Sequence, residues 1–494
     1  MDRSERKPGI PGWLATLGVA LVPLLGFWAT GLFDLDEGFY AAVVGEMNRR
    51  GDWVTPWYNG RPWFEKPILL YWLAKPTVAW FGEDWGPRLP SVLCAVGLAL
   101  LVRRAALRHG EAAGFWSAAV LSTSLLAVGL GRMMMTDMPM ALAFAACLLL
   151  FWGSLQGRPG LRPAAAACLA LAVLAKGPVA GALFLLIAAW TFWREPELRP
   201  GFRGGWLASV LVFVAVVSLW YAPAWWVHRG EFVQKFLVEQ NLARFGGGDE
   251  AHRVPFLPGL VYFVPVLLVG MFPWSLWIPR AWPRGGATDP FLRFCAAWAG
   301  VVFAFFTLSG TKLPHYILPA LPPLAILVGA RAGQAGWRPG WAWVASAAVC
   351  LLANGAFWAW YHGRLGGVPP HSEVHELARW VRERPGRIVS FQMGKQRGVP
   401  TRGLSETEHP SVVFYVRRDV VQTSDWSRLL ALRDAWVLTR RGRIEEARVG
   451  RANGEGLVLE PVRRLSRYEL WRLHPARAAA APGGTGRSAP PAGR

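Results

Sequence analysis

The sequence predicts an all-α polytopic membrane domain of about 11 transmembrane helices, followed by a small C-terminal α/β domain. Hydrophobic residues make up 53% of the 494 residues and charged residues only 17%, which is well below the roughly 25% typical of soluble proteins. Apolar runs near the 20 or so residues that a spanning helix needs recur over the first 360 residues. After Tyr361 the long apolar runs give way to short segments with helix-like or strand-like spacing.

Eleven apolar segments are candidate spans, and each is bounded by charged or turn-forming residues. The pair that flanks Lys176-Gly177-Pro178 could be one broken helix or two short helices. The segments cover residues 11–32, 87–107, 112–130, 138–155, 162–176, 178–193, 206–227, 258–279, 291–309, 314–332 and 340–361.

The charges of the connecting loops predict the orientation. Arginines concentrate in the N-terminal tail and in alternate short loops, whereas the short loops between them hold only Arg132, Lys176 and Lys312. Because cytoplasmic loops of membrane proteins carry the excess of Lys and Arg, we expect a cytoplasmic N-terminus. No small-residue cleavage site clearly follows the first apolar run, so we read it as a retained helix rather than a signal peptide. An odd number of spans then places the C-terminal domain outside.

Three parts of the chain follow from this pattern. Residues 1–361 form the transmembrane domain, with a first outer loop at 33–88 and a second at 228–257. Residues 362–475 form the small outer domain, where the spacing predicts a helix over 371–383 and strands over 387–392, 435–439 and 468–473. The tail, 476–494, is rich in Ala, Pro, Gly and Arg and is expected to be disordered.

Charge and cysteine usage exclude two other classes. The net charge of +21 comes from arginines spread over loops and the C-terminal region, so the membrane explains it better than a nucleic-acid partner. All five cysteines fall inside apolar runs rather than in the loops, which argues against a disulfide framework and for small packing residues.

The first outer loop holds the most informative residues. Asp36 and Glu37 follow the first helix directly, close to the membrane surface, where a carboxylate could act as general base on an incoming hydroxyl. The alternative is that Asp36 caps a helix over residues 37–50. We expect that helix and another over 67–81 to lie on the membrane surface.

The lysines form a second group of candidates. The chain has seven lysines against 46 arginines, and five of the seven fall on the predicted outer side. A compact ammonium retained where arginine is the default suggests phosphate binding, above all by Lys66 and Lys312. The alternative is that these lysines anchor the chain at lipid headgroups.

Polar residues of the later outer loops add to the same side of the membrane. Asp137 stands at the start of a predicted span as a second acid, or as a helix cap. Arg244 precedes a glycine run and suits bidentate phosphate binding. His252 could ligate a metal together with a carboxylate, or be an ordinary polar loop residue. Lys312 and Tyr316 begin a helix whose N-terminus favours anions, although interfacial anchoring would explain them too.

Several motifs together resemble a known family. They read D-E-G-F-Y, G-D-W-V-T-P-W-Y-N-G-R-P-W-F-E-K-P, R-M-M-M-T-D-M-P, N-L-A-R-F with a following H-R-V-P, and K-L-P-H-Y-I-L-P. In this order, over residues 10–335, they are similar to membrane glycosyltransferases of the C-type fold. The resemblance is to the bacterial lipid A aminoarabinose transferase group, which are relatives of the protein O-mannosyltransferases.

The resemblance implies a reaction and a set of roles. The donor would be a sugar on a polyprenyl phosphate such as undecaprenyl phosphate, and transfer would occur with inversion on the periplasmic side of the bacterial inner membrane. The acceptor would be lipid A, another envelope glycolipid or a protein, and the enzyme is expected to be a monomer. Asp36 would be the main catalytic acidic residue, with Glu37 beside it and Asp137 as the second acidic position. Lys66, Arg244, Lys312 and Tyr316 would bind the donor phosphate.

The resemblance also bears on cofactors. Glu65 and His252 match positions that can bind a divalent metal, with zinc, magnesium or manganese as candidates, and no nucleotide cofactor is expected. Eleven spans are fewer than expected for the aminoarabinose transferases, which leaves the acceptor open.

A transporter or flippase of polyprenyl-linked sugars is the alternative from another class. Such a protein should carry ionisable residues near the bilayer midplane on broken helices, usually in repeated halves. Here the ionisable residues gather at the outer boundary and no repeat is apparent, which favours the enzyme.

Overall fold

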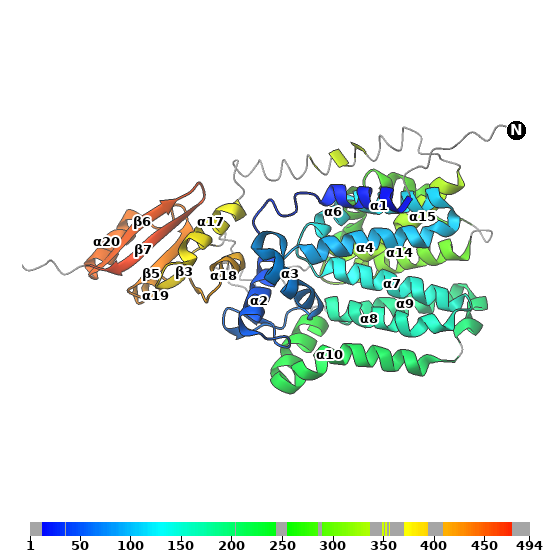
Figure 1. The fold of residues 1–494 in the computed structure, drawn as a ribbon, viewed down its shortest axis with the longest axis horizontal. Coiled ribbons are helices and arrows are strands. Elements are labelled where there is room, and N and C mark those ends of the chain that lie inside the picture. Colours follow the sequence, from blue (N-terminus) through cyan, green and yellow to red (C-terminus); the bar gives the residue numbers. More distant parts are fainter. Residues whose placement is uncertain are drawn as a thin grey trace, which may run out of the picture.

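The computed structural model describes most of the chain as a helical bundle joined to a small sheet domain (Figure 1). The described residues are 12–34, 36–202, 204–243, 254–284, 289–335, 348–349, 351–352, 355, 370–393 and 409–476. In Figure 1 the bundle and the sheet domain lie at opposite ends, and the two helices of the first loop, α2 and α3, stand between them. The last predicted span, 340–361, the predicted tail and the glycine-rich part of the second outer loop fall largely outside the described residues.

Long apolar helices form the bundle. Six helical segments in the described ranges are long and apolar enough to cross a membrane, and two bent helix pairs would raise that number to eight. The predicted spans 11–32 and 178–193 correspond to shorter apolar helices. The structure thus confirms a multi-pass helical fold and does not confirm the count of eleven. The six segments are Leu89–His109, Asp137–Leu155, Pro159–Lys176, Trp206–Phe236, Pro290–Leu308 and Pro314–Gln334, and the bent pairs are Glu111–Thr123 with Leu125–Gly131 and Leu257–Gly270 with Trp274–Ala281.

The innermost helix of the bundle is α15, Leu321–Gln334, which packs against α5, Glu111–Thr123. Its approach is close: a Cβ on Gly329 would lie 2.5 Å from the backbone nitrogen of Ser117. Small residues at such a crossing let the two backbones meet, which is the usual way in which membrane helices associate.

The structure decides one alternative that the sequence left open and moves one predicted boundary. The K-G-P sequence separates two helices, α8 (Arg162–Lys176) and α9 (Val179–Arg194), with Gly177 at a φ of 90°. The predicted loop from residue 228 instead begins as helix, because α10 runs over Trp206–Phe232 and a π-helical segment follows over Val233–Ala243. Aromatic packing supports this extension: Phe232 and Phe236 both lie against Trp220, with ring centroids 5.4 Å apart.

The first loop is compact and built on two helices. Helix α2 covers Asp36–Arg50, α3 covers Leu69–Trp85, and a short hairpin of β1 (Trp57–Tyr58) and β2 (Arg61–Pro62) lies between them. Both predicted helices are therefore present. The prediction that α2 lies on the lipid surface needs correction, because most of its residues are buried in the protein.

The C-terminal region is a five-stranded mixed sheet with helices on both faces. The strand order is β4-β3-β5-β7-β6; β3 pairs in parallel with β4 and β5, and β7 pairs antiparallel with β5 and β6. The structure confirms the predicted helix and three strands as α17, β3, β5 and β7, and it adds the elements that the sequence pattern did not predict. The strands are β3 (Arg387–Phe391), β4 (Val421–Thr423), β5 (Ala435–Arg440), β6 (Leu457–Arg464) and β7 (Tyr468–Pro475), and the helices are α17 (Pro370–Arg382), α18 (Pro410–Val416), α19 (Trp426–Leu430) and α20 (Glu446–Gly454).

Alternation along the strands explains the two faces. On β7, Leu470 joins the core that continues into the bundle, whereas its neighbour Trp471 belongs to a separate core under α19 and α20. Since successive strand residues point to opposite faces, β3, β5 and β7 each contribute to both cores. The inner core includes residues of α17 and α18, and α18 packs directly on α2. The sheet domain and the first loop thus share one hydrophobic core.

Candidate functional site

A cavity of about 200 Å³ lies where the first loop meets the outer ends of the bundle helices. Its wall combines the start of α2, the E-K-P turn before α3, the start of α7, the ends of α8 and α14, and the 3-10 helix η8 (Pro314–Ala320) that leads into α15. The polar residues of its lining are Asp36, Tyr40, Glu65, Lys66, Thr136, Asp137, Lys176, Ser309, Thr311, His315 and Tyr316. Five of the predicted site residues, Asp36, Glu65, Lys66, Asp137 and Tyr316, therefore meet in one place.

Asp36 is the exposed carboxylate of this cavity. It is the first residue of α2 and is solvent-exposed, whereas the next eight residues of the helix are buried. It stands inside the first turn rather than at the N-cap position, so the capping alternative does not describe its place. An acidic side chain in the first turn is favoured by the helix dipole. The helix thus holds the carboxylate at the cavity surface.

Tyr40 stands one turn further along α2 and faces the same space. Burial raises the pKa of its phenol well above the usual range, and the nearby Asp36 raises it further. The hydroxyl therefore stays protonated at neutral pH and can donate a hydrogen bond into the cavity.

Asp137 and Lys176 form an ion pair in the same cavity. The Lys176 ammonium donates to Asp137 Oδ1, and the carboxylate is buried while the lysine side chain is 17% exposed. The ammonium also stands 5.0 Å from the ring centroid of Tyr316. Asp137 begins α7, and Lys176 ends α8, so two helices bring the pair together. The cavity thus holds two lysines, Lys66 and Lys176, among three carboxylates.

Glu37 lies away from the cavity, which corrects its expected place in the active site. Arg88 donates to both of its carboxylate oxygens, each over 2.7 Å. The backbone N–H groups of Phe33 and Met134 donate to the same oxygens over 2.8 Å. Glu37 is fully buried, and Arg88 is 1% exposed. Its carboxylate is therefore committed to holding the loop and α4 together.

Lys312 also has a different place from the one predicted. Its ammonium donates to the carbonyls of Thr307 and Ser309, over 2.7 and 2.6 Å, and to that of Phe306 over 3.3 Å. These carbonyls belong to the end of α14, Pro290–Leu308, and the turn that follows it. A lysine at this position stabilises the unpaired carbonyls of a helix C-terminus. Lys312 is absent from the cavity lining in the described structure.

Two predicted residues, Arg244 and His252, lie outside the described residues. The predicted metal site rests on Glu65 together with His252. In the described ranges no cluster of three or more His, Cys, Asp or Glu side chains could hold a metal ion. Glu65 lines the cavity as one candidate ligand, so the described residues alone do not make a metal centre.

Sequence reasoning did not single out Lys176 or Tyr40 as site residues. The signal for Lys176 was present, since it is one of seven lysines and was expected on the outer side. Tyr40 gave no such signal, because an aromatic residue in an amphipathic helix is usually a packing residue. Helix packing alone decides that both face the cavity.

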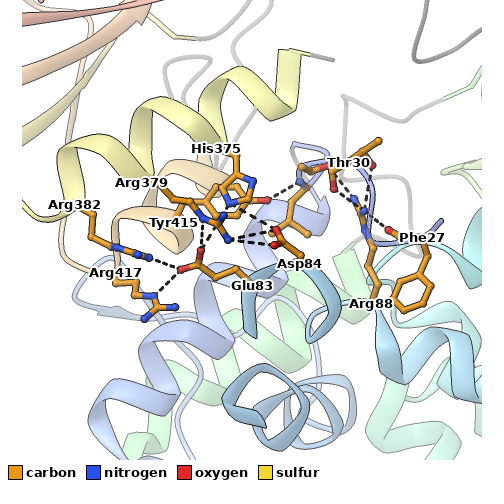
Figure 2. Close-up of polar contacts among 12 residues, drawn as sticks. Phe27, Thr30, Glu83, Asp84, Arg88, His375, Arg379, Arg382, Tyr415 and Arg417 are labelled. Carbon is orange, nitrogen blue, oxygen red and sulfur yellow. Dashed lines mark hydrogen bonds and ion pairs between the residues drawn. The ribbon is translucent and has the colours of Figure 1, made fainter. Parts of the chain in front are cut away.

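An ionic cluster joins α3 to the C-terminal domain (Figure 2). Glu83 Oε1 accepts from Arg382 over 2.7 Å and from Arg417 over 2.6 Å, and Glu83 Oε2 accepts from Arg379 over 2.9 Å. Burial alone would raise the pKa of Glu83, but hydrogen bonds from His375 and Arg379 and the charge of Arg417 lower it to about 2. The carboxylate is therefore ionised, and it anchors the sheet domain on the first loop.

The sequence is similar to known membrane transferases. Residues 65–221 match the family model described as dolichyl-phosphate-mannose-protein mannosyltransferase. An undecaprenyl phosphate-alpha-4-amino-4-deoxy-L-arabinose arabinosyl transferase of Sodalis glossinidius is 32% identical over 67% of this chain and 61% of its own length. An uncharacterized protein of Aquifex aeolicus is 32% identical over 62% of this chain and 69% of its own length. The chain spans about 60% of the curated arabinosyl transferases that it matches.

The fold is similar to that of a solved relative along nearly its whole length. The crystal structure of ArnT from Cupriavidus metallidurans bound to undecaprenyl phosphate has a TM-score of 0.72 and covers 94% of this chain and 98% of its own, at 20% identity. The archaeal oligosaccharyltransferase AglB from Archaeoglobus fulgidus has a TM-score of 0.51 at 12% identity, covering 87% of this chain and 69% of its own. The sequence matches confirm the resemblance that the motifs gave, and the solved structures show the same fold. The chain belongs to the ArnT-like membrane glycosyltransferases.

Proposed function

We propose that this chain transfers a sugar from undecaprenyl phosphate to an acceptor at the periplasmic face of the bacterial inner membrane, with inversion at the anomeric carbon. One observation carries the proposal: an exposed carboxylate, Asp36, and two lysines, Lys66 and Lys176, line the same cavity. Transfer from a sugar phosphate needs one base for the acceptor and cations for the leaving phosphate. The family's arabinosyl transferases carry undecaprenyl phosphate in their name, which supports the same carrier here.

The reaction assigns one role to each charge. Asp36 takes the proton of the acceptor hydroxyl as the acceptor oxygen forms its bond to the anomeric carbon. The bond between that carbon and the phosphate oxygen breaks at the same time, and its electron pair leaves on the phosphate. Lys66 stabilises this developing charge, together with Arg244 from the second outer loop. The bond that breaks supplies the driving force, so the reaction calls for no nucleotide.

Lys176 is the second cation of the cavity, and Asp137 holds it in place. The ion pair with buried Asp137 holds the Lys176 ammonium at the cavity surface. The adjacent ring of Tyr316 favours the same ammonium position through its π face. A phosphate that enters the cavity would meet a fixed cation there rather than a flexible one, which lowers the cost of ordering the side chain.

An apolar groove offers a place for the polyprenyl chain. It lies between α9 and α14, has a volume of about 1100 Å³, and includes Leu186, Trp190, Val301 and Phe305 in its lining. Phe305 also lines the catalytic cavity, so groove and cavity adjoin at that ring. We propose that the prenyl units lie in this groove with the phosphate in the cavity. Burial of an isoprenoid chain would stabilise the complex at roughly 25 cal/mol per Å².

A second groove favours a lipid acceptor over a protein. It has a volume of about 970 Å³ and lies between α6 (Leu125–Gly131) and α12 (Phe263–Gly270). Its lining is mostly apolar and includes Asp34 and Pro314, each of which is one or two positions in sequence from a residue of the catalytic cavity. A glycolipid such as lipid A could lay acyl chains here and present a hydroxyl or phosphate to Asp36.

The metal, the orientation and the oligomeric state remain proposals of the same kind. Glu65 is one ligand for a divalent ion, with His252 as the other candidate, and no step of the reaction above depends on it. The distribution of arginines supports a cytoplasmic N-terminus and a periplasmic C-terminal domain. We expect the monomer to be active, because the cavity is built from one chain.

The test compares purified wild type with Asp36→Asn in detergent or nanodiscs. Undecaprenyl phosphate carrying aminoarabinose, mannose or glucose serves as donor, lipid A as acceptor, and mass spectrometry follows the transfer. Glu111→Gln is the matched control, because it changes a carboxylate whose side chain is 74% exposed and which is not among the residues that line the cavity.

Each outcome has one meaning. Transfer by wild type and Glu111→Gln, but not by a folded Asp36→Asn, would support the proposal. Equal activity in Asp36→Asn would remove Asp36 as the base. No transfer from any donor, with lipid-linked sugar crossing vesicle membranes instead, would establish a flippase and overturn the proposal.

A further inference from the structure

The chain that leads into α2 is held by the C-terminal domain two residues before Asp36. Asp34 Oδ1 accepts the backbone N–H of Ser411 over 2.9 Å. Asp34 Oδ2 accepts the Ser411 hydroxyl over 2.5 Å and stands 2.7 Å from His409 Nδ1. The Asp34 side chain is only 6% exposed, and Ser411 is 1% exposed. The contact is therefore a buried clasp between residues 377 positions apart in sequence.

The clasp touches the first turn of α2 directly. A Cβ on Gly38 would lie 2.1 Å from Asp34 Oδ1 and 2.8 Å from the backbone nitrogen of Ser411, both far inside contact distance. The glycine of the D-E-G-F-Y motif is thus required by the close approach of Asp34 and the start of α18. The Gly38 N–H also donates to the Phe33 carbonyl over 3.0 Å, which closes the turn before the helix.

A second anchor stands on the other side of Asp36. Glu37 is fixed by Arg88 and receives the Phe33 N–H, as described above. One residue upstream, the Leu32 N–H donates to the Tyr415 hydroxyl over 2.8 Å, which is a further bond to α18. Asp36 therefore lies between Asp34, held by the C-terminal domain, and Glu37, held by the membrane domain.

We propose that the C-terminal domain positions Asp36 for catalysis through this clasp, with Asp34 and Ser411 as positioning residues. The inference rests on the proposed role of Asp36 as base. A base works only within hydrogen-bond reach of the proton that it takes, and a misplacement of about 1 Å can cost on the order of a hundredfold in rate. The sheet domain thus contributes to the rate of transfer by fixing the position of Asp36, a residue of the first outer loop.

The test uses three full-length variants and a double mutant. Ser411→Ala removes one hydroxyl donor, and Asp34→Asn keeps the size of the side chain and an oxygen for the Ser411 N–H. Gln422→Ala is the matched control, because Gln422 also donates across the same domain interface, over 3.0 Å, but to the Tyr58 hydroxyl rather than to a residue of the segment 32–38. Transfer kinetics are measured with the undecaprenyl phosphate sugars named above, and hydrogen exchange is followed for the amides of residues 37–40.

We expect Ser411→Ala and Asp34→Asn each to lower kcat by about tenfold or more, because the base is displaced rather than removed. The donor KM should stay within about twofold, because the donor contacts are intact. The double mutant should be no worse than the more damaged single mutant, since both break one contact. Exchange at residues 37–40 should quicken in both variants and not in Gln422→Ala.

Two results would overturn the inference while the proposed function stands. One is a kcat for Ser411→Ala and Asp34→Asn equal to that of Gln422→Ala. The other is a loss that is additive in the double mutant. If Ser411→Ala does not fold, Asp34→Asn alone decides. Inactivity of wild type with every donor would instead overturn the proposed function, and exchange at residues 37–40 that matches Gln422→Ala would then overturn the clasp as well.

Discussion

Glu37 and Arg88 form a buried ion pair that joins the first outer loop to the start of α4. The Arg88 guanidinium also donates to the carbonyls of Phe27 and Thr30, over 2.6 and 2.9 Å (Figure 2). It therefore binds the segment before the first outer loop as well as Glu37 inside that loop. Glu37 is adjacent to Asp36 in sequence, yet the two carboxylates have opposite surroundings. One is saturated with donors, and the other is exposed at the cavity. Neighbouring acids in one motif thus separate into a structural and a chemical role.

The first prediction separates these two roles. Glu37→Gln should lower the free energy of unfolding by about 3–5 kcal/mol, because it leaves the buried Arg88 charge uncompensated. Asp36→Asn should leave stability nearly unchanged, because its side chain is exposed. Thermal unfolding of both variants in the same detergent measures the difference. Equal unfolding midpoints for the two would contradict the assignment.

The second prediction concerns two lysines. Lys176→Met should weaken binding of undecaprenyl phosphate by about tenfold or more, because a charge-assisted contact to the phosphate is lost. Lys312→Met should leave this affinity unchanged but lower the free energy of unfolding by about 1–3 kcal/mol, since it frees the carbonyls at the end of α14. Binding to purified protein, together with thermal unfolding, distinguishes them. A loss of affinity in Lys312→Met would restore it as a phosphate ligand.

The third prediction is a pH dependence of domain docking. The pKa of Glu83 is about 2 in the folded protein, against an ordinary value of 4.5. Its contribution is therefore fully present above about pH 4.5 and is lost as the pH falls through about 2. Thermal stability of wild type should decline over this range, and Glu83→Gln should decline less because it has no proton to take up. Parallel curves for the two proteins would show that the ionic cluster does not hold the domain.

The fourth prediction tests the close approach at Gly38. Gly38→Ala should abolish most transfer activity and lower stability, because the new methyl group would overlap Asp34 and the backbone of Ser411. Gly181→Ala is the matched control, since a Cβ on that helical glycine would meet nothing within 4 Å. The control should be as stable as wild type or slightly more stable. An active and stable Gly38→Ala protein would mean that α18 can move away from α2 without consequence.

Composition and apolar spacing were enough to predict much of this protein. They predicted the multi-pass helical domain, because a helix that crosses a membrane needs a long apolar run and such runs are visible in the sequence. They also predicted the two helices of the first loop and the change to an α/β domain, from the spacing of the apolar residues. The sequence also predicted Asp36, Glu65, Lys66, Asp137 and Tyr316 as site residues, and all five line one cavity. Charged residues at the ends of apolar segments are few, so they are easy to find.

Only the tertiary structure decided which of these charges are used by the fold itself. Glu37 and Lys312 are as prominent in the sequence as Asp36 and Lys66. In the structure, however, Glu37 pairs with Arg88, and Lys312 binds the carbonyls at the end of α14. The pairing of Lys176 with Asp137, and of Asp34 with Ser411, depends on helices that are distant in sequence and meet by packing. The sequence determines which chemistry a side chain can perform. Its partners, and therefore its role, depend on contacts between segments that are distant in the sequence and meet only when the chain folds.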